Sequence, residues 1–311
     1  MGNGNLKAAV HIKLNKSEYS PEEEVKGKVY FQLSELSSSG VLVLKFQGRE
    51  QTFLDDSKFY GQPRIRVAET KLVDVRVPIY NFDCSLEEGL RVFYFSFILP
   101  GNLPGTFRFG NEDSFAEIKY TLTVEFTNQN NQKFSNSRQL LIVEKPQLAQ
   151  TLCIEKRISQ GRSFLRKKGF TIVKFELSKD IYTPEDNLCI KANLDNSNSM
   201  RNISQMTIDF FRTVKLCSKN KSFKLYKQKL LSKTLSGVGA GETMLTQDFK
   251  EIEFDLKQGH LDFVYTTQSK LVQCLYSLEL ELETEETSGC CQSPYKSCLM
   301  FCPRVSPKLF N

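Results

Sequence analysis

The sequence YSPEEEV at residues 19–25 occurs a second time, as YTPEDNL at residues 182–188. The match extends upstream, where Lys16 corresponds to Lys179. The second copy begins 163 positions after the first, in a chain of 311 residues. Because solenoid repeats have periods of roughly 20–50 residues, this spacing indicates a duplicated domain and not a repeat array.

Short runs in which apolar and polar residues alternate fill both halves of the chain. The clearest are residues 118–126 (IKYTLTVEF) and 276–282 (YSLELEL). Alternation with a period of two is typical of strands that bury one face, and Pro21 and Pro184 mark turns. No helical periodicity lasts beyond two turns. The sequence therefore predicts an all-β protein with two tandem Ig-like β-sandwich domains.

The boundaries follow from where the alternation stops and resumes. The polar, basic stretch that starts near Pro146 is expected to connect the two domains, and the alternation is lost again after residue 284. The expected parts are a first sandwich at residues 1–146, a linker at 147–168, a second sandwich at 169–284 and a Cys-rich tail at 285–311.

Composition points to an ordinary globular protein, with 40% hydrophobic and 25% charged residues. The net charge of +6 is mild, and nucleic-acid binders cluster their basic residues more densely. Residues 1–5 (MGNGN) carry no apolar signal segment. We therefore expect a cytoplasmic location and reduced thiols for the nine cysteines.

The residues that enzymes require are missing from the sequence. The two histidines, His11 and His260, have no evident acid–base partners. The glycine-rich residues 237–241 (GVGAG) lack the Lys-Ser/Thr pair of a phosphate-binding loop, and residues 22–24 (EEE) are typical of a solvated turn. We expect no catalytic activity, no cofactor and no metal site.

Basic residues concentrate in the expected linker and in one hairpin of the second half. Because like charges this close repel one another, the alternative to plain solvated surface is a site for anionic lipid headgroups, inositol phosphates or phosphorylated tails. The candidate residues are Lys215, Lys219, Lys221, Lys224, Lys227, Lys229 and Lys233 on the hairpin, and Arg166, Lys167 and Lys168 on the linker.

Four cysteines lie in the expected tail, at Cys290, Cys291, Cys298 and Cys302. Their spacing lacks the paired C-x2-4-C pattern of zinc sites. Cysteines beside a membrane can be S-acylated, and one acyl chain together with a polybasic patch gives a stable anchor. The tail is therefore predicted to be either S-acylated or simply disordered.

Residues 95–107 (FSFILPGNLPGTF), followed by 118–124 (IKYTLTV), closely resemble the N-terminal domain of arrestins. That family shows F-x-F-x-L-P-x-x-L-P-x-S/T-F and then I-x-Y-x-L-x-V. The turn at residues 19–27 is also similar to a family turn, with Glu22 where Gly is common. The second half resembles the C-terminal arrestin domain more loosely. The short, helix-poor form is most similar to the α-arrestin, or arrestin-domain-containing, branch.

The resemblance implies a non-enzymatic cytosolic adaptor. Such a protein binds the cytoplasmic tails of membrane proteins and couples them to endocytic and vesicular trafficking machinery, in peripheral contact with the plasma membrane or endosomes and their anionic phospholipids. The tail offers Ser293-Pro294-Tyr295, one proline short of the Pro-Pro-x-Tyr motif that recruits ubiquitin ligases. Arg138 lies one position from the buried arginine that β-arrestins use as a phosphate switch, which places it on the other face of its strand.

Two alternatives stay open at this point. The chain could be a fixed structural subunit of a coat, of a retromer-like complex or of a cytoskeletal assembly, and the missing Pro-Pro-x-Tyr motif favours this class. It could also be a lipid-tethered membrane-binding module.

Overall fold

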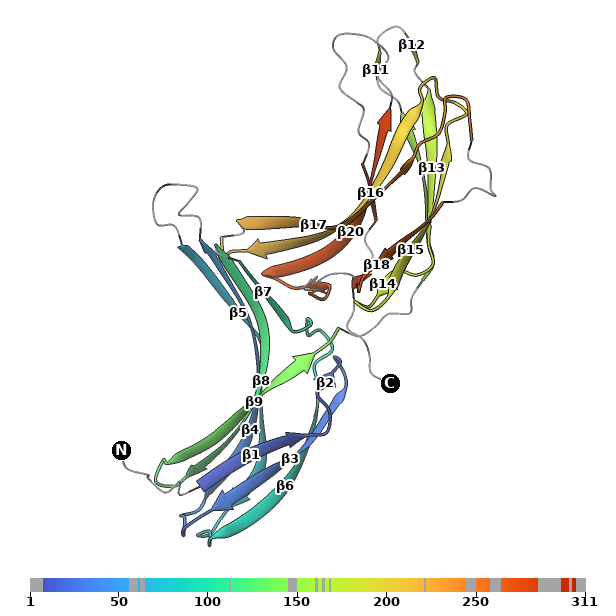
Figure 1. Cartoon of the computed structure of the whole chain (residues 1–311). Helices are drawn as coiled ribbons and strands as arrows, with labels where there is room; N and C mark the ends of the chain where they lie inside the picture. Colours follow the sequence, from blue (N-terminus) through green and yellow to red (C-terminus); the bar gives the residue numbers. More distant parts are fainter. Residues whose placement is uncertain are drawn as a thin grey trace. The chain divides into compact units, whose positions relative to one another are not determined.

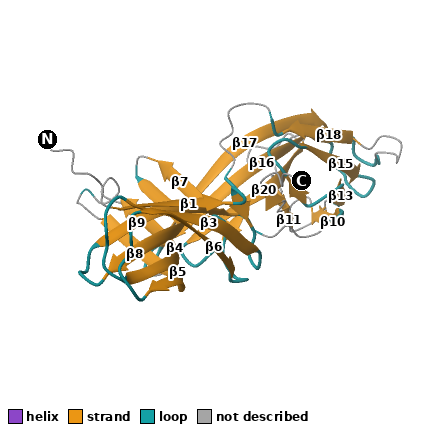
Figure 2. Cartoon of the chain, turned by 90° about the horizontal axis from the view of Figure 1, so that it is seen from below, coloured by secondary structure: helices purple, strands orange, loops and turns teal. Residues whose placement is uncertain are grey.

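A computed structural model describes residues 8–55, 61, 65–111, 113–144, 150–159, 162–163, 166–167, 169–220, 222–243, 250–257, 264–284, 298–301 and 304–305. In these residues every helix-or-strand element is a β-strand (Figures 1 and 2), which confirms the expected all-β class. The chain forms two compact units. Unit 1 comprises Met1–Lys145, Leu216–Lys224 and Thr267–Val272, and unit 2 comprises Pro146–Lys215, Leu225–Thr266 and Gln273–Asn311.

Unit 1 contains two sheets whose buried faces pack against each other. The smaller sheet has the order β1-β3-β6, and the larger has the order β2-β9-β8-β4-β5, with β7 also paired to β8. The strands are β1 (Ala8–Leu14), β2 (Glu18–Tyr19), β3 (Glu24–Leu33), β4 (Gly40–Asp55), β5 (Ile65–Phe82), β6 (Gly89–Ile98), β7 (Phe107–Asn111), β8 (Ser114–Asn128) and β9 (Lys133–Ile142).

The period-two alternation of β8 is also its burial pattern, since every second residue from Ser114 to Asn128 is buried. Aromatic side chains join the two sheets: the ring centroids of Phe31 and Phe126 lie 4.7 Å apart, and those of Phe46 and Phe97 lie 5.4 Å apart. Burying such rings removes large apolar areas from water, which is the main driving force for the sandwich.

Unit 2 is built from the same kind of strands. One sheet has the order β10-β13-β15-β18, and another has the order β17-β16-β20-β19 with β21 paired to β20. The strands of the second half of the chain, of which β19 belongs to unit 1, are β10 (Leu152–Ser159), β11 (Arg162–Ser163), β12 (Arg166–Lys167), β13 (Phe170–Leu177), β14 (Ile181–Tyr182), β15 (Asn187–Asp195), β16 (Ile203–Cys217), β17 (Phe223–Ser236), β18 (Lys250–Asp255), β19 (Thr267–Gln268), β20 (Val272–Thr284), β21 (Cys298–Phe301) and β22 (Arg304–Val305).

The repeated sequence forms the same turn twice. In unit 1 the Glu23 carboxylate accepts a hydrogen bond from the Ser20 amide at 2.9 Å and pairs with Lys16. In unit 2 the Asp186 carboxylate accepts one from the Thr183 amide at 2.6 Å and pairs with Lys179 at 2.9 Å. The tyrosine of each copy is almost fully buried. A sequence repeat that returns as the same set of contacts supports duplication of one domain.

The position of Glu22 in this turn explains why glycine is common there in arrestins. Glu22 has a φ of 67°, in the left-handed region. A side chain with a Cβ atom is disfavoured in that region by about 1–2 kcal/mol, whereas glycine is not.

The two turn carboxylates predict a stability that depends on pH. Burial raises the pKa of each carboxyl, but the hydrogen bonds from the backbone and the lysine outweigh it, so the pKa values of Glu23 and Asp186 fall below their ordinary values. A lowered folded-state pKa stabilises the fold above the ordinary pKa and loses that contribution as pH falls. We expect the double variant Glu23→Gln/Asp186→Asn to melt below wild type at pH 7, with the gap closing below about pH 4.

Differential scanning calorimetry at several pH values measures this gap. Glu88→Gln is the matched control, because Glu88 is exposed and has no ion pair among the described residues. A gap that stays constant from pH 7 to pH 3 would contradict the assignment.

Two segments that the sequence analysis placed outside the sandwiches are strands. β10 lies in the expected linker and pairs along its whole length with β13. β21 and β22 lie in the expected tail, where Leu278 pairs with Phe301 and Tyr182 with Val305. In unit 1 the single strand β9 pairs with both β8 and β2. β21 and β22 therefore correspond to β9 in the second copy, within residues that the sequence analysis expected to form a tail.

The buried carboxyl of Glu50 organises the part of unit 1 that comes from the second half of the sequence. Its Oε1 accepts hydrogen bonds from the amides of Leu271 and Val272, both at 2.8 Å, and from the hydroxyl of Ser269. Glu50 is 0% exposed. Thr52, on the same face of β4, donates to the carbonyl of Cys217 at 2.7 Å. Unit 1 thus holds Thr267–Val272 through hydrogen bonds that Glu50 accepts, and Leu216–Lys224 through one that Thr52 donates.

Candidate functional site

The outer face of the β1-β3-β6 sheet departs from the usual polar exterior of a sandwich. Along β6, every second residue from Leu90 to Ile98 faces away from the core, and all of these except Ser96 are apolar: Leu90 is 61% exposed, Val92 41%, Tyr94 73% and Ile98 70%. We call these residues the β6 ladder. The other face of β6 supplies Phe93, Phe95 and Phe97 to the unit. The strand is therefore apolar on both sides although one side meets solvent.

Cationic side chains lie next to the β6 ladder. The register places Lys28 of β3 opposite Tyr94, and Lys13 of β1 opposite Lys28. The ammonium group of Lys28 lies 5.0 Å from the centroid of the Tyr94 ring, a cation–π distance. His11 is exposed on β1, with its ring 6.3 Å from that of Tyr30. We call Lys13 and Lys28 the cationic flank.

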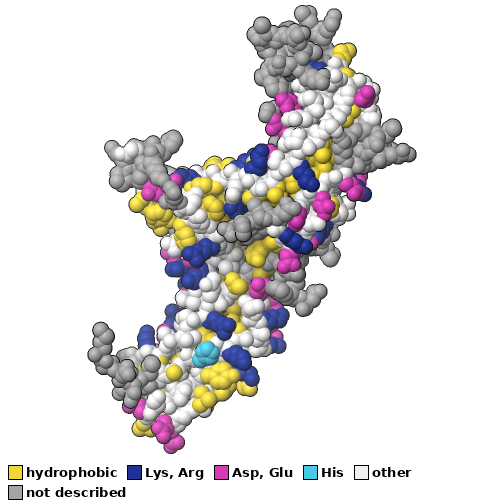
Figure 3. Space-filling model, in the orientation of Figure 1, with side chains coloured by type: hydrophobic (Ala, Val, Ile, Leu, Met, Phe, Trp, Pro, Cys, Tyr) yellow, Lys and Arg dark blue, Asp and Glu magenta, His cyan; other side chains and the backbone are white. Residues whose placement is uncertain are grey.

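Acidic groups on this face do not balance the cationic flank. Glu24 forms an ion pair with Lys26 at 2.8 Å, so its charge is balanced by that lysine and not by Lys13 or Lys28. The face as a whole combines an apolar ladder with an excess of positive charge. In Figure 3, hydrophobic and basic side chains lie side by side over unit 1, next to the histidine.

The ladder lies on an end strand. In the described part of the chain β6 pairs with β3 and has no strand on its other side. One row of its backbone N–H and C=O groups is consequently open to pairing, and an extended peptide can add there as a further strand. Because side chains of an added strand alternate in direction, such a peptide would place every second residue beside the ladder.

Other kinds of site have little support in the described residues. They contain no group of three or more His, Cys, Asp or Glu side chains arranged to hold a metal ion. No helix long and apolar enough to cross a bilayer occurs in the part of the chain that the structure describes.

Two lysines of the predicted basic hairpin are neutralised by acidic neighbours, and two more have other partners. Lys227 pairs with Glu279 at 2.6 Å, and Lys229 pairs with Asp209 at 2.8 Å. Lys224 donates to the carbonyl of Asp55 at 2.7 Å, and Lys233 lies 5.9 Å from the ring of Phe254. Four of the predicted lysines thus have partners within the protein, which reduces the charge available to an anionic ligand.

The remaining candidates fall in several places. Lys215 lies on β16, and Lys219 follows it in the turn before β17. Arg166 and Lys167 form β12, which pairs with β11. The backbone of Cys298 begins β21, opposite Glu281. Lys168, Lys221, Cys290, Cys291 and Cys302 lie outside the described residues, so lipid binding and S-acylation stay predictions.

Five cysteines have side chains that the structure describes, and they differ in exposure. Cys84, Cys153 and Cys189 are exposed, Cys217 is half-buried and Cys274 is buried; all five are free thiols. Burial raises the pKa of the Cys274 thiol to about 12. Arg138 is exposed and donates to the carbonyl of Ile12 at 3.4 Å. The register places it on the same face of β9 as the buried Leu140, so the expectation that it lies on the strand's other face is wrong.

The sequence analysis did not single out the β6 ladder. The signal was present, because residues 90–99 (LRVFYFSFIL) are apolar at both odd and even positions. That pattern is typical of a strand covered on both faces. An end strand with this composition exposes one of its faces, and only the strand order reveals that.

Residues 10–149 match the family model described as "Arrestin (or S-antigen), N-terminal domain". The match confirms the arrestin resemblance for the first sandwich and covers less than half of the chain. It supports an adaptor-type role in trafficking or signalling, whereas assignment to the α-arrestin branch stays a prediction. No curated protein matches the chain significantly.

Proposed function

We propose that this protein is a non-enzymatic cytoplasmic adaptor that binds the cytoplasmic tails of membrane proteins and links them to endocytic or vesicular trafficking. The observation that supports this most is the apolar β6 ladder on an open end strand of a domain that matches arrestins. The ladder offers an extended segment both backbone hydrogen bonds and apolar contacts.

The side chains of the β6 ladder and the cationic flank indicate which kind of tail sequence would bind there. Covering one exposed Leu, Val or Ile side chain contributes about 1.5–3 kcal/mol when burial is complete. The excess of lysines in the cationic flank adds attraction for acidic side chains and raises the association rate. The preferred segment is therefore extended, apolar at alternate positions and acidic in between.

Proximity labelling in cells tests the proposal, with wild type, the variant Tyr94→Ser/Ile98→Ser and the control Leu36→Ser. Leu36 is 71% exposed but lies outside the β6 ladder. Wild type and the control should label membrane proteins and trafficking components, and the ladder variant should lose most of that labelling. Losing about 2.8 kcal/mol of contact corresponds to a hundredfold weaker complex.

Absence of membrane-protein and trafficking neighbours around wild type would sink the adaptor proposal. Labelling that is unchanged in the ladder variant would leave the adaptor role standing but move the docking site elsewhere. Thermal melts of all three proteins exclude unfolding as the cause of any loss.

A second candidate is a fixed subunit of a coat or retromer-like assembly. The absence of Pro-Pro-x-Tyr from the sequence, where only Ser293-Pro294-Tyr295 occurs, favours it. Native size-exclusion of cell extract separates the two, because a subunit elutes quantitatively in a large complex and an adaptor elutes mostly free.

Membrane contact is a further part of the proposal. Residues of the basic hairpin and the linker would contact anionic headgroups, and acyl chains on Cys290, Cys291, Cys298 and Cys302 would tether the chain. Replacing the four cysteines by serine should release the protein from membranes on fractionation if the tether exists. The domain boundaries given above likewise remain proposed.

A further inference from the structure

Three cations lie in one row on the solvent face of the larger sheet of unit 1. Arg49 of β4 is directly opposite Lys71 of β5 on one side and Lys119 of β8 on the other. Neighbouring strands are about 4.8 Å apart, so the three Cα atoms fall within roughly 10 Å. We call these three residues the cation row.

Such a row is unfavourable for the fold on its own. Like charges directly opposite each other on a sheet are destabilising. Asp74 engages Lys71 and also accepts a hydrogen bond from Gln47 at 3.3 Å. Among the described residues, however, neither Arg49 nor Lys119 has an ion pair.

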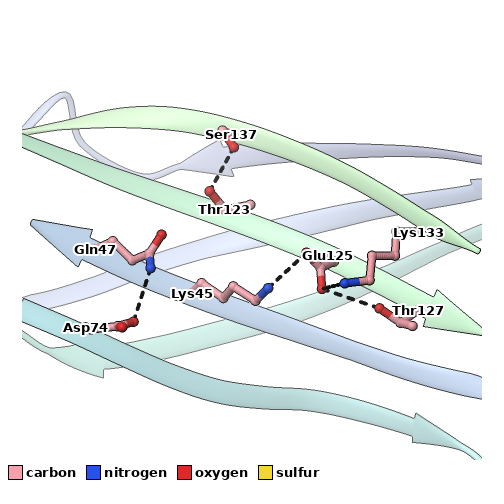
Figure 4. Close-up of polar contacts among 8 residues, drawn as sticks. All are labelled: Lys45, Gln47, Asp74, Thr123, Glu125, Thr127, Lys133 and Ser137. Atoms are coloured by element: carbon pink, nitrogen blue, oxygen red, sulfur yellow. Dashed lines mark hydrogen bonds and ion pairs between the residues drawn. The ribbon is translucent and has the colours of Figure 1, made fainter. Parts of the chain in front are cut away.

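Elsewhere on the same face, one carboxylate balances two cations. Lys45 lies 2.9 Å from the carboxylate of Glu125, and Lys133 lies 3.9 Å from it (Figure 4). Thr123 and Ser137 are hydrogen-bonded to each other at 2.8 Å. On this face, therefore, Lys45 and Lys133 are balanced by a carboxylate of the sheet, whereas in the part of the chain that the structure describes Arg49 and Lys119 are not.

The row lines a surface hollow of about 450 Å³. A shift in register between β4 and β5 at Gly48 and Arg49 lies at the hollow and leaves Leu72 unpaired. Such bulges recur beside functional sites, because they redirect side chains. The volume falls in the range of roughly 300–1,000 Å³ that small-molecule sites occupy. The lining residues are Gln47, Gly48, Arg49, Glu69, Lys71, Val73, Lys119 and Thr121.

The functional groups in the hollow define a ligand chemistry. A guanidinium group binds phosphate oxygens through two parallel hydrogen bonds, and lysines add point charges. Gln47 and Thr121 can donate further hydrogen bonds. Glu69 accepts hydrogen bonds only, so it repels a phosphate but pairs well with a hydroxyl group. The set suits a molecule that carries both phosphates and free hydroxyls.

We propose that this hollow binds a polyol bearing two or more phosphate groups, held by Arg49, Lys71 and Lys119 at the phosphates and by Glu69 at a hydroxyl. The inference is independent of the docking function proposed for the β6 ladder, because the cation row lies on the other sheet. The same headgroup chemistry occurs in soluble inositol phosphates and in phosphoinositide lipids.

Isothermal titration of the full chain with inositol 1,4,5-trisphosphate tests the site, and flotation with phosphatidylcholine vesicles containing phosphatidylinositol 4,5-bisphosphate tests the lipid form. The variant Arg49→Gln/Lys119→Gln is compared with Lys45→Gln/Lys133→Gln, which removes the same charge from the same face outside the hollow. We expect the first variant to bind the trisphosphate at least tenfold more weakly, and the second to stay within about threefold of wild type. Affinity should also fall as salt rises.

Binding of the free trisphosphate without vesicle flotation would support the proposal with a soluble ligand, and binding of both would support it with a lipid headgroup. The proposal is overturned if wild type binds neither probe, or if both double variants weaken binding equally. It is also overturned if wild type prefers a doubly phosphorylated peptide and ignores the trisphosphate. Circular dichroism melts confirm that each variant is folded.

Discussion

Replacing Glu50 by alanine is expected to lower the thermal midpoint of unit 1 by about 6–12 °C. The change removes the acceptor of three hydrogen bonds, two from the amides of Leu271 and Val272 and one from Ser269. A buried donor left without an acceptor costs about 1–3 kcal/mol. A loss of about 3 kcal/mol, which is the lower end for three donors, shifts the midpoint by about 6–12 °C, because each kcal/mol corresponds to about 2–4 °C in a domain of this size. Thermal unfolding followed by tyrosine fluorescence measures the shift.

Hydrogen exchange locates the effect of this change. In Glu50→Ala the amides of Leu271 and Val272 should lose protection, since their acceptor is gone. Glu50→Gln keeps one carbonyl oxygen at the site and should lose less than half as much stability. A midpoint for Glu50→Ala within 1 °C of wild type, with both amides still protected, would show that the carboxyl does not hold this segment.

Strands that bury one face could be predicted from the sequence. β8 is an example, since its alternation from Ser114 to Asn128 is also its burial pattern. The duplicated turn was predictable for a different reason: Lys16, Tyr19 and Glu23 interact within a few residues, so the sequence carries the whole set of contacts. Local patterns of this kind need no knowledge of the strand order.

Strands outside such patterns were missed for physical reasons. β21 reads CLMF and is too short to show a period, and it is held by pairing with β20. β10 is interrupted by charged residues at Glu155, Lys156 and Arg157, which are all exposed. Long-range pairing stabilises both strands, and no local signal reports it.

The candidate sites could be predicted even less well than the strands, because they depend on which distant strands pair. Counting lysines predicted the basic hairpin, but Asp209 and Glu279, which neutralise Lys229 and Lys227, come from separate strands. The cation row was invisible in the sequence, since Arg49, Lys71 and Lys119 become neighbours only through the register of three strands. The sequence gives the number of charged residues, whereas the pairing of strands determines which of them become neighbours.

Asn196 holds the corresponding buried polar centre of unit 2. It is 0% exposed. Its Oδ1 accepts a hydrogen bond from Thr171 at 2.7 Å, and its Nδ2 donates to the carbonyls of Arg201 and Gly239, both at 2.9 Å. One amide side chain thus ties the end of β15 to the start of β13 and to the loops on either side of β16 and β17.

Asn196→Ala is therefore expected to destabilise unit 2 by about 3 kcal/mol or more, because each buried polar group left without a partner costs about 1–3 kcal/mol. Asn198→Ala is the matched control: its side chain is exposed, bonds only to Ser197 among the described residues, and should change stability by less than about 0.5 kcal/mol. Urea unfolding of both variants, with the slope and midpoint fitted together, measures the difference. Equal midpoints for the two would mean that the Asn196 side chain is not required to join these segments, and that backbone bonds such as that from the Ser199 amide to the Asn196 carbonyl, at 3.0 Å, hold them instead.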